Sequence, residues 1–102
     1  MTETFVHIWL ATVEPQTSDE ALEHFRELAQ EAPLRVQGLK GVGVLLSDDR
    51  TRIVAISEWG ARDDWGRAQW DEHVQDLVAR MFRSVKRLDS HLYREVFRFG
   101  EM

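Results

Sequence analysis

Apolar residues along the chain form runs of two kinds, one typical of buried strands and one of amphipathic helices. Residues 5–13 and 52–59 are almost continuously apolar, as expected for strands that are covered on both faces. The short apolar run 42–46 lies just before the second of these and predicts its hairpin partner. Residues 91–99 alternate charged and apolar side chains, which predicts an edge strand.

Between these strands the apolar residues recur every three or four positions, which predicts helices that bury one side. The first helix is expected from about Ser18 to Gln30, with Thr17 and Glu20 forming a capping box at its start. A short helix is predicted over residues 61–69. A second long helix follows Asp71, its predicted cap. The apolar stripe of that helix comprises Val74, Leu77, Val78, Met81, Phe82 and Val85.

The predicted order of elements is β-α-β-β-α-β, which matches an α+β fold of the ferredoxin-like type. Its four-stranded antiparallel sheet places strands one and three in the centre, with the helices on one face. No repeat, low-complexity segment or linker interrupts residues 1–102, so we expect a single domain.

The two central strands carry large apolar side chains in both directions, but two helices can cover only one face of such a sheet. The other face needs a different cover. A two-fold homodimer provides one, because identical apolar faces can pack against each other. We therefore predict a homodimer that buries the open sheet face.

The amino-acid composition disfavours several kinds of binding partner and cellular location. The net charge of −5 disfavours nucleic acid, whose phosphates repel an acidic surface. The chain has no cysteine, which excludes disulfides and thiolate ligands and agrees with a cytoplasmic location. The apolar run 5–13 is too short for a membrane span or a signal segment, so neither is expected.

Four tryptophans in 102 residues supply flat apolar surfaces that suit a ring-shaped ligand, although packing in the core or at the dimer interface explains them equally well. His7 is the ionisable residue of an apolar strand and needs a hydrogen-bond partner if buried; Tyr93, Glu95 and Ser57 are the candidates. The four histidines show no metal-binding spacing, so no metal site is predicted.

One segment carries a family resemblance. Glu58-Trp59-Gly60-Ala61-Arg62-Asp63-Asp64-Trp65, leading to Trp70-Asp71-Glu72-His73, resembles the antibiotic biosynthesis monooxygenase family, in which a third-strand tryptophan is followed by an aromatic position and a helical histidine. The resemblance implies a dimeric α+β barrel with a pocket between the sheet and the second helical region in each subunit.

The resemblance also implies a function and a set of site residues. We expect a monooxygenase-type oxidoreductase, acting without a cofactor on a small aromatic or enolisable molecule. The expected catalytic residues are His73, His7 and Tyr93. The residues expected to contact the substrate are Trp59, Trp65, Trp9 and Phe82.

One departure from the family weakens these expectations. Family members that degrade heme or oxidise substrates without a cofactor resemble one another in using a strand asparagine, and this chain contains no asparagine. The missing asparagine argues against heme degradation, but heme bound through His73 stays open as an alternative. A non-redox cyclase or lyase that uses His7 and Tyr93, and a non-catalytic protein that binds heme or a hydrophobic metabolite, also stay open.

Overall fold

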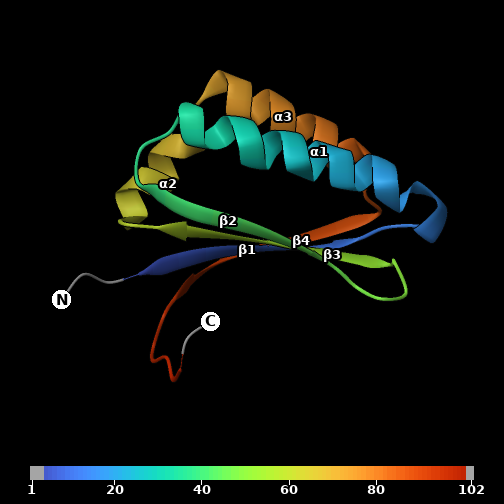
Figure 1. Cartoon of the computed structure of the whole chain (residues 1–102). Helices are drawn as coiled ribbons and strands as arrows, with labels where there is room; N and C mark the ends of the chain where they lie inside the picture. The colour runs from blue at the N-terminus through green and yellow to red at the C-terminus, as the bar shows by residue number, and fades with distance from the viewer. Residues whose placement is uncertain (1–3, 101–102) are drawn as a thin grey trace.

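The computed structural model describes residues 4–100, which form one antiparallel sheet with helices on one side of it (Figure 1). Short 3-10 turns lie at Pro15–Thr17 and Ala32–Leu34. The strands are β1 (Phe5–Thr12), β2 (Leu39–Leu46), β3 (Arg52–Trp59) and β4 (Arg87–Arg94), and the helices are α1 (Ser18–Glu31), α2 (Arg62–Ala68) and α3 (Glu72–Arg83).

The strands lie in the order β2-β3-β1-β4, so the two most apolar strands, β1 and β3, are central. Every neighbouring pair is antiparallel. Helices α1 and α3 pack side by side across the same face of the sheet (Figure 1). The predicted ferredoxin-like α+β fold is thus confirmed, including the placement of its central and edge strands.

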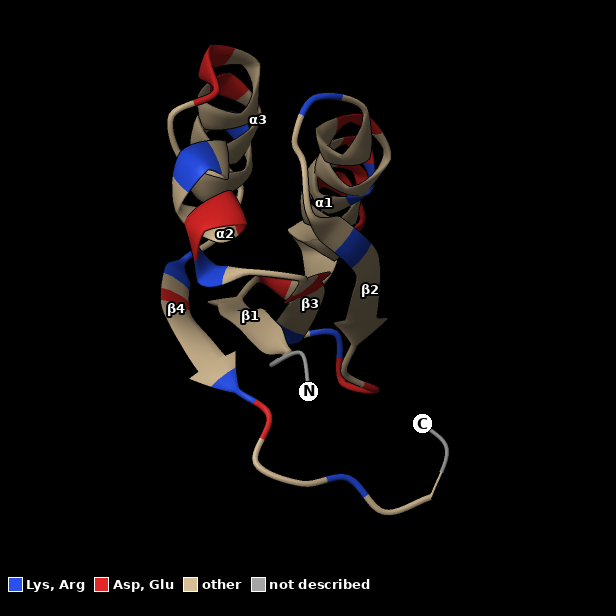
Figure 2. Cartoon of the chain, turned by 90° about the vertical axis from the view of Figure 1, so that its left-hand side faces the viewer, with Lys and Arg blue, Asp and Glu red and all other residues tan. Residues whose placement is uncertain are grey.

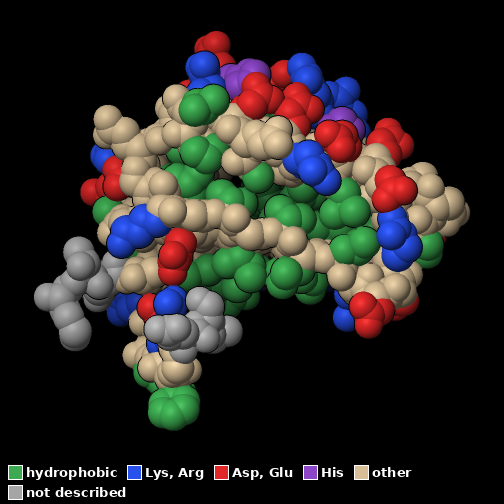
Figure 3. Space-filling view, viewed as in Figure 1, with side chains coloured by type: hydrophobic (Ala, Val, Ile, Leu, Met, Phe, Trp, Pro, Cys, Tyr) green, Lys and Arg blue, Asp and Glu red, His purple; other side chains and the backbone are tan. Residues whose placement is uncertain are grey.

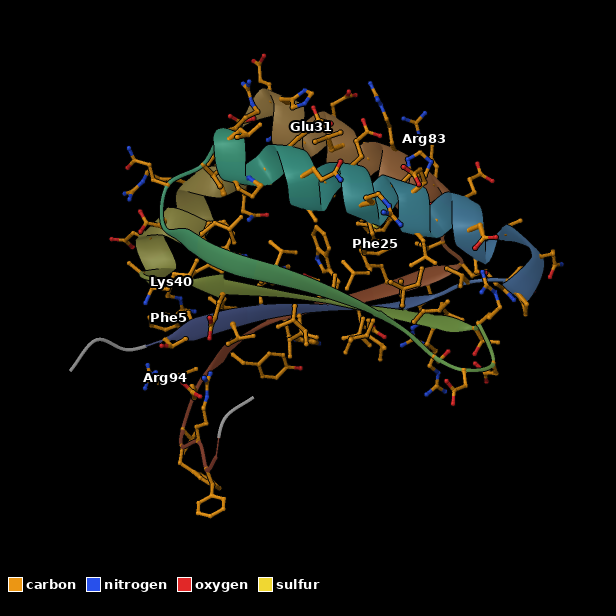
Figure 4. All side chains as sticks on the ribbon, in the orientation of Figure 1. Phe5, Phe25, Glu31, Lys40, Arg83 and Arg94 are labelled. Atoms are coloured by element: carbon orange, nitrogen blue, oxygen red, sulfur yellow. The ribbon has the colours of Figure 1, made fainter. Side chains whose placement is uncertain are left out.

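The hydrophobic core lies between the sheet and the helices. Because adjacent residues of a strand point to opposite faces, Ala11 and the facing Ile53 point toward the helices, and both are fully buried. Phe25 of α1 and Met81 of α3 pack against them. Figure 4 shows Phe25 reaching down from α1 toward the sheet.

The long helices begin differently from one another. The Asp71 carboxylate accepts a hydrogen bond from the Val74 backbone N–H at 3.0 Å, which confirms the predicted cap of α3. The capping box predicted for α1 is wrong, because the Thr17 side chain caps no backbone N–H and instead donates to the Glu14 carbonyl. Arg50 binds the start of α1 by donating to Ser18 Oγ at 3.0 Å.

The last strand begins and ends earlier than the sequence indicated. The prediction was residues 91–99, whereas β4 pairs with β1 from Arg87, opposite Thr12, to Arg94, opposite Phe5. Residues 87–90, which the prediction left outside the strand, are largely polar. They nevertheless pair with β1, which supplies partners for their backbone hydrogen bonds.

The sheet face away from the helices remains open and is largely apolar. Its side chains include Ile8 and the facing Ile56, together with Val54, Leu10 and the 58 % exposed Leu45. Figure 3 shows hydrophobic side chains both between the two layers and beneath the sheet. The segment after β4 hangs on this open side and exposes Val96, Phe97 and Phe99 (Figure 1).

The loop before β2 contains a position that favours glycine. Gly38 has a φ of +81°, and a Cβ built there would lie 2.2 Å from Asp64 Oδ2 of α2. We expect Gly38→Ala to lower the free energy of unfolding by about 1–3 kcal/mol, measured by urea denaturation. Gly66→Ala is the matched control. Its Cβ would meet no atom within 4 Å, and helix propensity predicts a change of up to about 1 kcal/mol in the stabilising direction. Equal stabilities for Gly38→Ala and the unmodified chain would contradict the prediction.

Candidate functional site

A cavity lies between the sheet and the helical layer, over β1, β2 and β3 and beneath α1, α2 and α3. The cavity volume is about 70 Å³, and the empty space counted together with the opening to solvent is about 640 Å³. Its walls are mostly aromatic and aliphatic, and its polar side chains are His7, Ser57 and Gln69. The cavity lies where the resemblance implies a pocket, between the sheet and the second helical region, and α1 adds a further wall.

His7 enters the cavity from β1. It follows the same alternation that directs Trp9 and Ala11 toward the helices, and only 6 % of its surface is exposed. Its Nε2 lies 2.7 Å from Ser90 Oγ of β4, and Trp9 Nε1 donates to the same oxygen at 3.0 Å. The rings of His7 and Trp9 meet edge to face, with centroids 5.2 Å apart. The imidazole is thereby held in one orientation.

Burial changes the acid–base behaviour of His7. Removal of the imidazolium from water, aided by the nearby His91, lowers the pKa of His7 from 6.5 to about 4. His7 is consequently neutral at physiological pH. A neutral imidazole in an apolar wall can accept a proton or a hydrogen bond from a ligand.

Trp65 faces His7 from α2. The two rings lie 5.4 Å apart between centroids, at an angle of 46°. The Trp65 Nε1 atom is buried and has no hydrogen-bond partner among the described residues. An unpaired buried donor costs about 1–3 kcal/mol, a cost that a ligand acceptor reaching this N–H would relieve.

Helix α2 is short and begins without a side-chain cap, but Asp63 and Asp64 lie in its first turn, where carboxylates favour the helix dipole. The Asp64 side chain packs against Gly38, at the start of β2. This contact fixes the helix that carries Trp65 at one end of the cavity.

Trp59, at the end of β3, supplies another aromatic wall. It is 6 % exposed, and its Nε1 donates to Ser57 Oγ at 2.9 Å. Its N–H is thus already satisfied. The structure brings together four of the predicted site residues around the cavity, namely His7, Trp9, Trp59 and Trp65.

His73 lies outside the cavity, which corrects the prediction that it borders the pocket. It precedes Val74 in α3, and one helical position turns its ring by about 100° away from the buried stripe. Its Nε2 lies 2.8 Å from Glu31 Oε1 of α1, on the outer side of the helical layer.

Tyr93 and His7 do not form the predicted polar cluster. Tyr93 is opposite Val6 in the register, so its side chain lies on the open face while His7 lies on the helical face. Its ring is 48 % exposed and contacts His91 at 6.1 Å between centroids. Strand alternation alone would have separated the two residues once the register was known.

Phe82 also lies away from the cavity, contrary to the prediction. It is 53 % exposed on α3, whose buried side is centred on Val74, Leu77 and Met81. The predicted apolar stripe included it, but a residue at the edge of such a stripe can remain in solvent.

The sequence reasoning missed Ser90 as the partner of His7. Because the last strand was predicted to begin at His91, Ser90 fell in a connecting segment. The alternation of Leu88, Ser90 and Leu92 was the available signal, since it predicts three side chains on one face of a strand.

Heme does not fit the site through His73, because that ring contacts Glu31 outside the cavity. His7 is the histidine that lines the cavity, and its Nε2 is held by Ser90. Among residues 4–100, no group of three histidine or carboxylate side chains is placed to hold a metal ion. In the same range, no helix is long and apolar enough to cross a membrane.

Comparison with known proteins identifies the fold. No protein-family model matches the sequence, and no curated protein matches it either. Many solved structures do. SnoaB from Streptomyces nogalater, a cofactor-independent oxygenase crystallised as an Asn-to-Ala variant, superposes with a TM-score of 0.82 at 17% identity, covering 99% of this chain and 100% of SnoaB.

Two further structures agree with this result. A Nitrosomonas europaea protein, whose name provisionally assigns it to the antibiotic biosynthesis monooxygenases, has a TM-score of 0.80 at 19% identity, covering 98% of this chain and 97% of its own. A conserved Methanosarcina mazei protein has a TM-score of 0.81 at 14% identity, covering 92% and 94%. The chain therefore has the fold of the antibiotic biosynthesis monooxygenases, as the sequence resemblance predicted.

The lowered pKa of His7 predicts a pH-dependent stability. Between about pH 6.5 and about pH 4 the unfolded chain binds a proton at His7 that the folded chain does not, so stability falls as pH falls through this window. Urea denaturation should show a loss of roughly 2 kcal/mol between about pH 7 and about pH 4.5 from this residue. His7→Gln should remove that part of the pH dependence. The pKa of Asp49, lowered to about 2 mainly by its hydrogen bonds from Thr51 and Ser47, acts only below this window. An unchanged pH profile in His7→Gln would refute the assignment.

Proposed function

We propose that this chain is a cofactor-independent oxidoreductase of monooxygenase type, which oxidises a small aromatic, enolisable molecule in the cavity. The observation that carries the proposal is the pairing of an unsatisfied donor, Trp65 Nε1, with the neutral His7 inside an apolar chamber. A bound enolate needs both a hydrogen-bond donor for its oxygen and a nearby group that can take its proton.

The walls favour a flat substrate. Trp59 and Trp65 present aromatic surfaces on the β3 and α2 sides, and Phe25 and Trp9 close the inner end. Aromatic side chains bind planar rings through offset and edge contacts, so a flat molecule suits these walls.

In the proposed reaction, the ring CH₂ that is conjugated with the substrate carbonyl, directly or through the ring as in anthrone, loses a proton to the imidazole of His7. The tautomer that donates from Nε2 to Ser90 leaves Nδ1 as the acceptor. The imidazolium is then stabilised by the enolate, which Trp65 Nε1 holds by its oxygen. One electron passes from the carbanion to O₂, and the two radicals combine to a peroxide. The peroxide takes back the proton and loses water, so that CH₂ and O₂ give C=O and H₂O.

Oxygen consumption with anthrone and with 1,4-naphthoquinol tests the proposal. We expect turnover in the unmodified chain and a loss of about tenfold or more in both His7→Ala and Trp65→Phe, since each removes one of the two groups that act on the enolate. His24→Ala alters a partly buried histidine of α1 that does not line the cavity, and it serves as the control. His73→Ala discriminates between the sequence-based and structure-based assignments, and only the first predicts a loss.

Two outcomes would contradict the proposal. Conversion of a substrate at the same rate without oxygen would indicate a non-redox cyclase or lyase. Quenching of tryptophan fluorescence by these compounds, with no consumption of either compound or oxygen, would indicate a binding protein.

We further propose that two copies pair through the open sheet face. Its apolar residues would gain about 1.5–3 kcal/mol for each fully buried large side chain. Gly41 and Gly43 on β2 leave space there, since a Cβ at either position would meet no atom within 4 Å. The exposed phenylalanines after β4 hang on this same side.

Sedimentation velocity at micromolar concentration should give about twice the 11.9 kDa mass of the chain. Val54→Glu, at the centre of the open face, should give the monomer because it buries an unpaired charge in the interface. Leu34→Glu, at an 83 % exposed position on a 3-10 turn, should leave the dimer intact. A monomeric unmodified chain would refute the pairing.

A further inference from the structure

A second hollow adjoins the cavity at one end of the molecule. It lies between the loop before β2 and the turn that joins α2 to α3, and its walls include Arg35, Arg67 and Trp70. Val36 and Ala68 line both the hollow and the cavity, so these two side chains form a shared wall. Figure 2 looks onto this end, where α2 and the loop after α1 lie side by side.

The hollow is lined by the guanidinium groups of Arg35 and Arg67 and by the carboxylate of Asp71, and both arginines are ion-paired. Arg35 Nε donates to Asp71 Oδ1 at 2.9 Å, and Arg67 donates to Asp64 through Nη2. The Arg35 and Arg67 side chains are 47% and 67% exposed, whereas their partners Asp71 and Asp64 are 20% and 19% exposed. The guanidinium groups are thus more exposed to solvent than the carboxylates that they bind. The remaining guanidinium N–H groups of both arginines make no other hydrogen bond recorded among residues 4–100.

The hollow also contains an aromatic side chain, Trp70, that is largely exposed to solvent. Trp70 is 80 % exposed at the turn between the two helices, beside the two arginines. Guanidinium groups bind carboxylates through paired N–H donors, and an indole face adds an apolar surface next to them. Such a combination selects an anionic group attached to an apolar body.

We propose that the hollow binds the carboxylate of an aromatic acid whose ring system occupies the cavity. Arg35 and Arg67 hold the carboxylate, Trp70 covers the adjoining apolar part, and the molecule reaches from one space to the other past Val36 and Ala68, which line both. This inference rests on the proposed function, and it narrows the substrate class from aromatic molecules in general to aromatic carboxylic acids.

Binding of a matched pair of compounds tests this inference. Anthracene-2-carboxylate and anthracene-2-carboxamide share the ring system and differ in charge, and their dissociation constants follow from quenching of tryptophan fluorescence. We expect the acid to bind about tenfold or more tightly than the amide, as charge-assisted hydrogen bonds predict. Raising salt from about 50 to about 500 mM should reduce this preference.

Arginine variants test whether the preference for the acid over the amide arises in the hollow. The double variant Arg35→Gln/Arg67→Gln should abolish the preference while leaving amide binding unchanged. Arg83→Gln/Arg87→Gln removes the same charge at the end of α3, where Figure 4 shows Arg83, and at the start of β4, and should retain the preference. Circular dichroism checks folding, since Arg35 also contacts the cap of α3. Arg35→Lys/Arg67→Lys keeps the charge and should recover part of the preference.

The outcomes separate this inference from the function on which it rests. Equal affinities for acid and amide in the unmodified chain overturn the inference and leave the cavity proposal standing, as does a preference that survives in Arg35→Gln/Arg67→Gln. Loss of the preference in Arg83→Gln/Arg87→Gln also overturns it, because general charge would then be the cause. If neither compound binds, both proposals fail. If an oligoglutamate peptide binds through the same arginines and neither compound competes with it, the hollow docks an acidic protein segment instead.

Discussion

The alternation of side chains along β1 is the constraint on which the candidate site depends. With a repeat of two residues, the strand directs His7, Trp9 and Ala11 to the helical side, and Ile8 and Leu10 to the open side. A shift of one residue in register would reverse this arrangement and place His7 in solvent. Pairing with β3 on one edge and β4 on the other holds the register on both sides.

The cavity combines good packing with incomplete polar pairing. The indole N–H groups of Trp9 and Trp59 each donate to a serine, whereas that of Trp65 has no partner within the described range 4–100. An apolar replacement would avoid the cost of this unpaired donor, about 1–3 kcal/mol, so the arrangement suits a chamber that is completed by a ligand. The neutral imidazole of His7, opposite Trp65, is also incompletely paired. Its hydrogen bond with Ser90 compensates only in part for the loss of water around the ring.

The surface of the molecule divides into regions with different physical properties. The open face is apolar and lacks a covering layer within the chain, whereas the outer side of the helices carries many charged residues (Figure 3). The hollow beside α2 differs from both, because it joins guanidinium groups to an exposed indole within an acidic molecule. These differences give each surface a separate proposed partner: a second copy, solvent and an aromatic acid.

The sequence by itself determined the fold class, because apolar repeats of two and of about 3.6 residues report local geometry that neighbouring residues share. It also indicated the tryptophans and His7, since an aromatic or ionisable residue within an apolar strand stands out. It could not give the register of β4, and therefore neither the contact of Ser90 with His7 nor the separation of Tyr93 from it. The contact of His73 with Glu31 depended on how α1 packs beside α3. These features were decided only by the tertiary structure, because contacts between residues far apart in sequence depend on how complete elements pack, which no local pattern records.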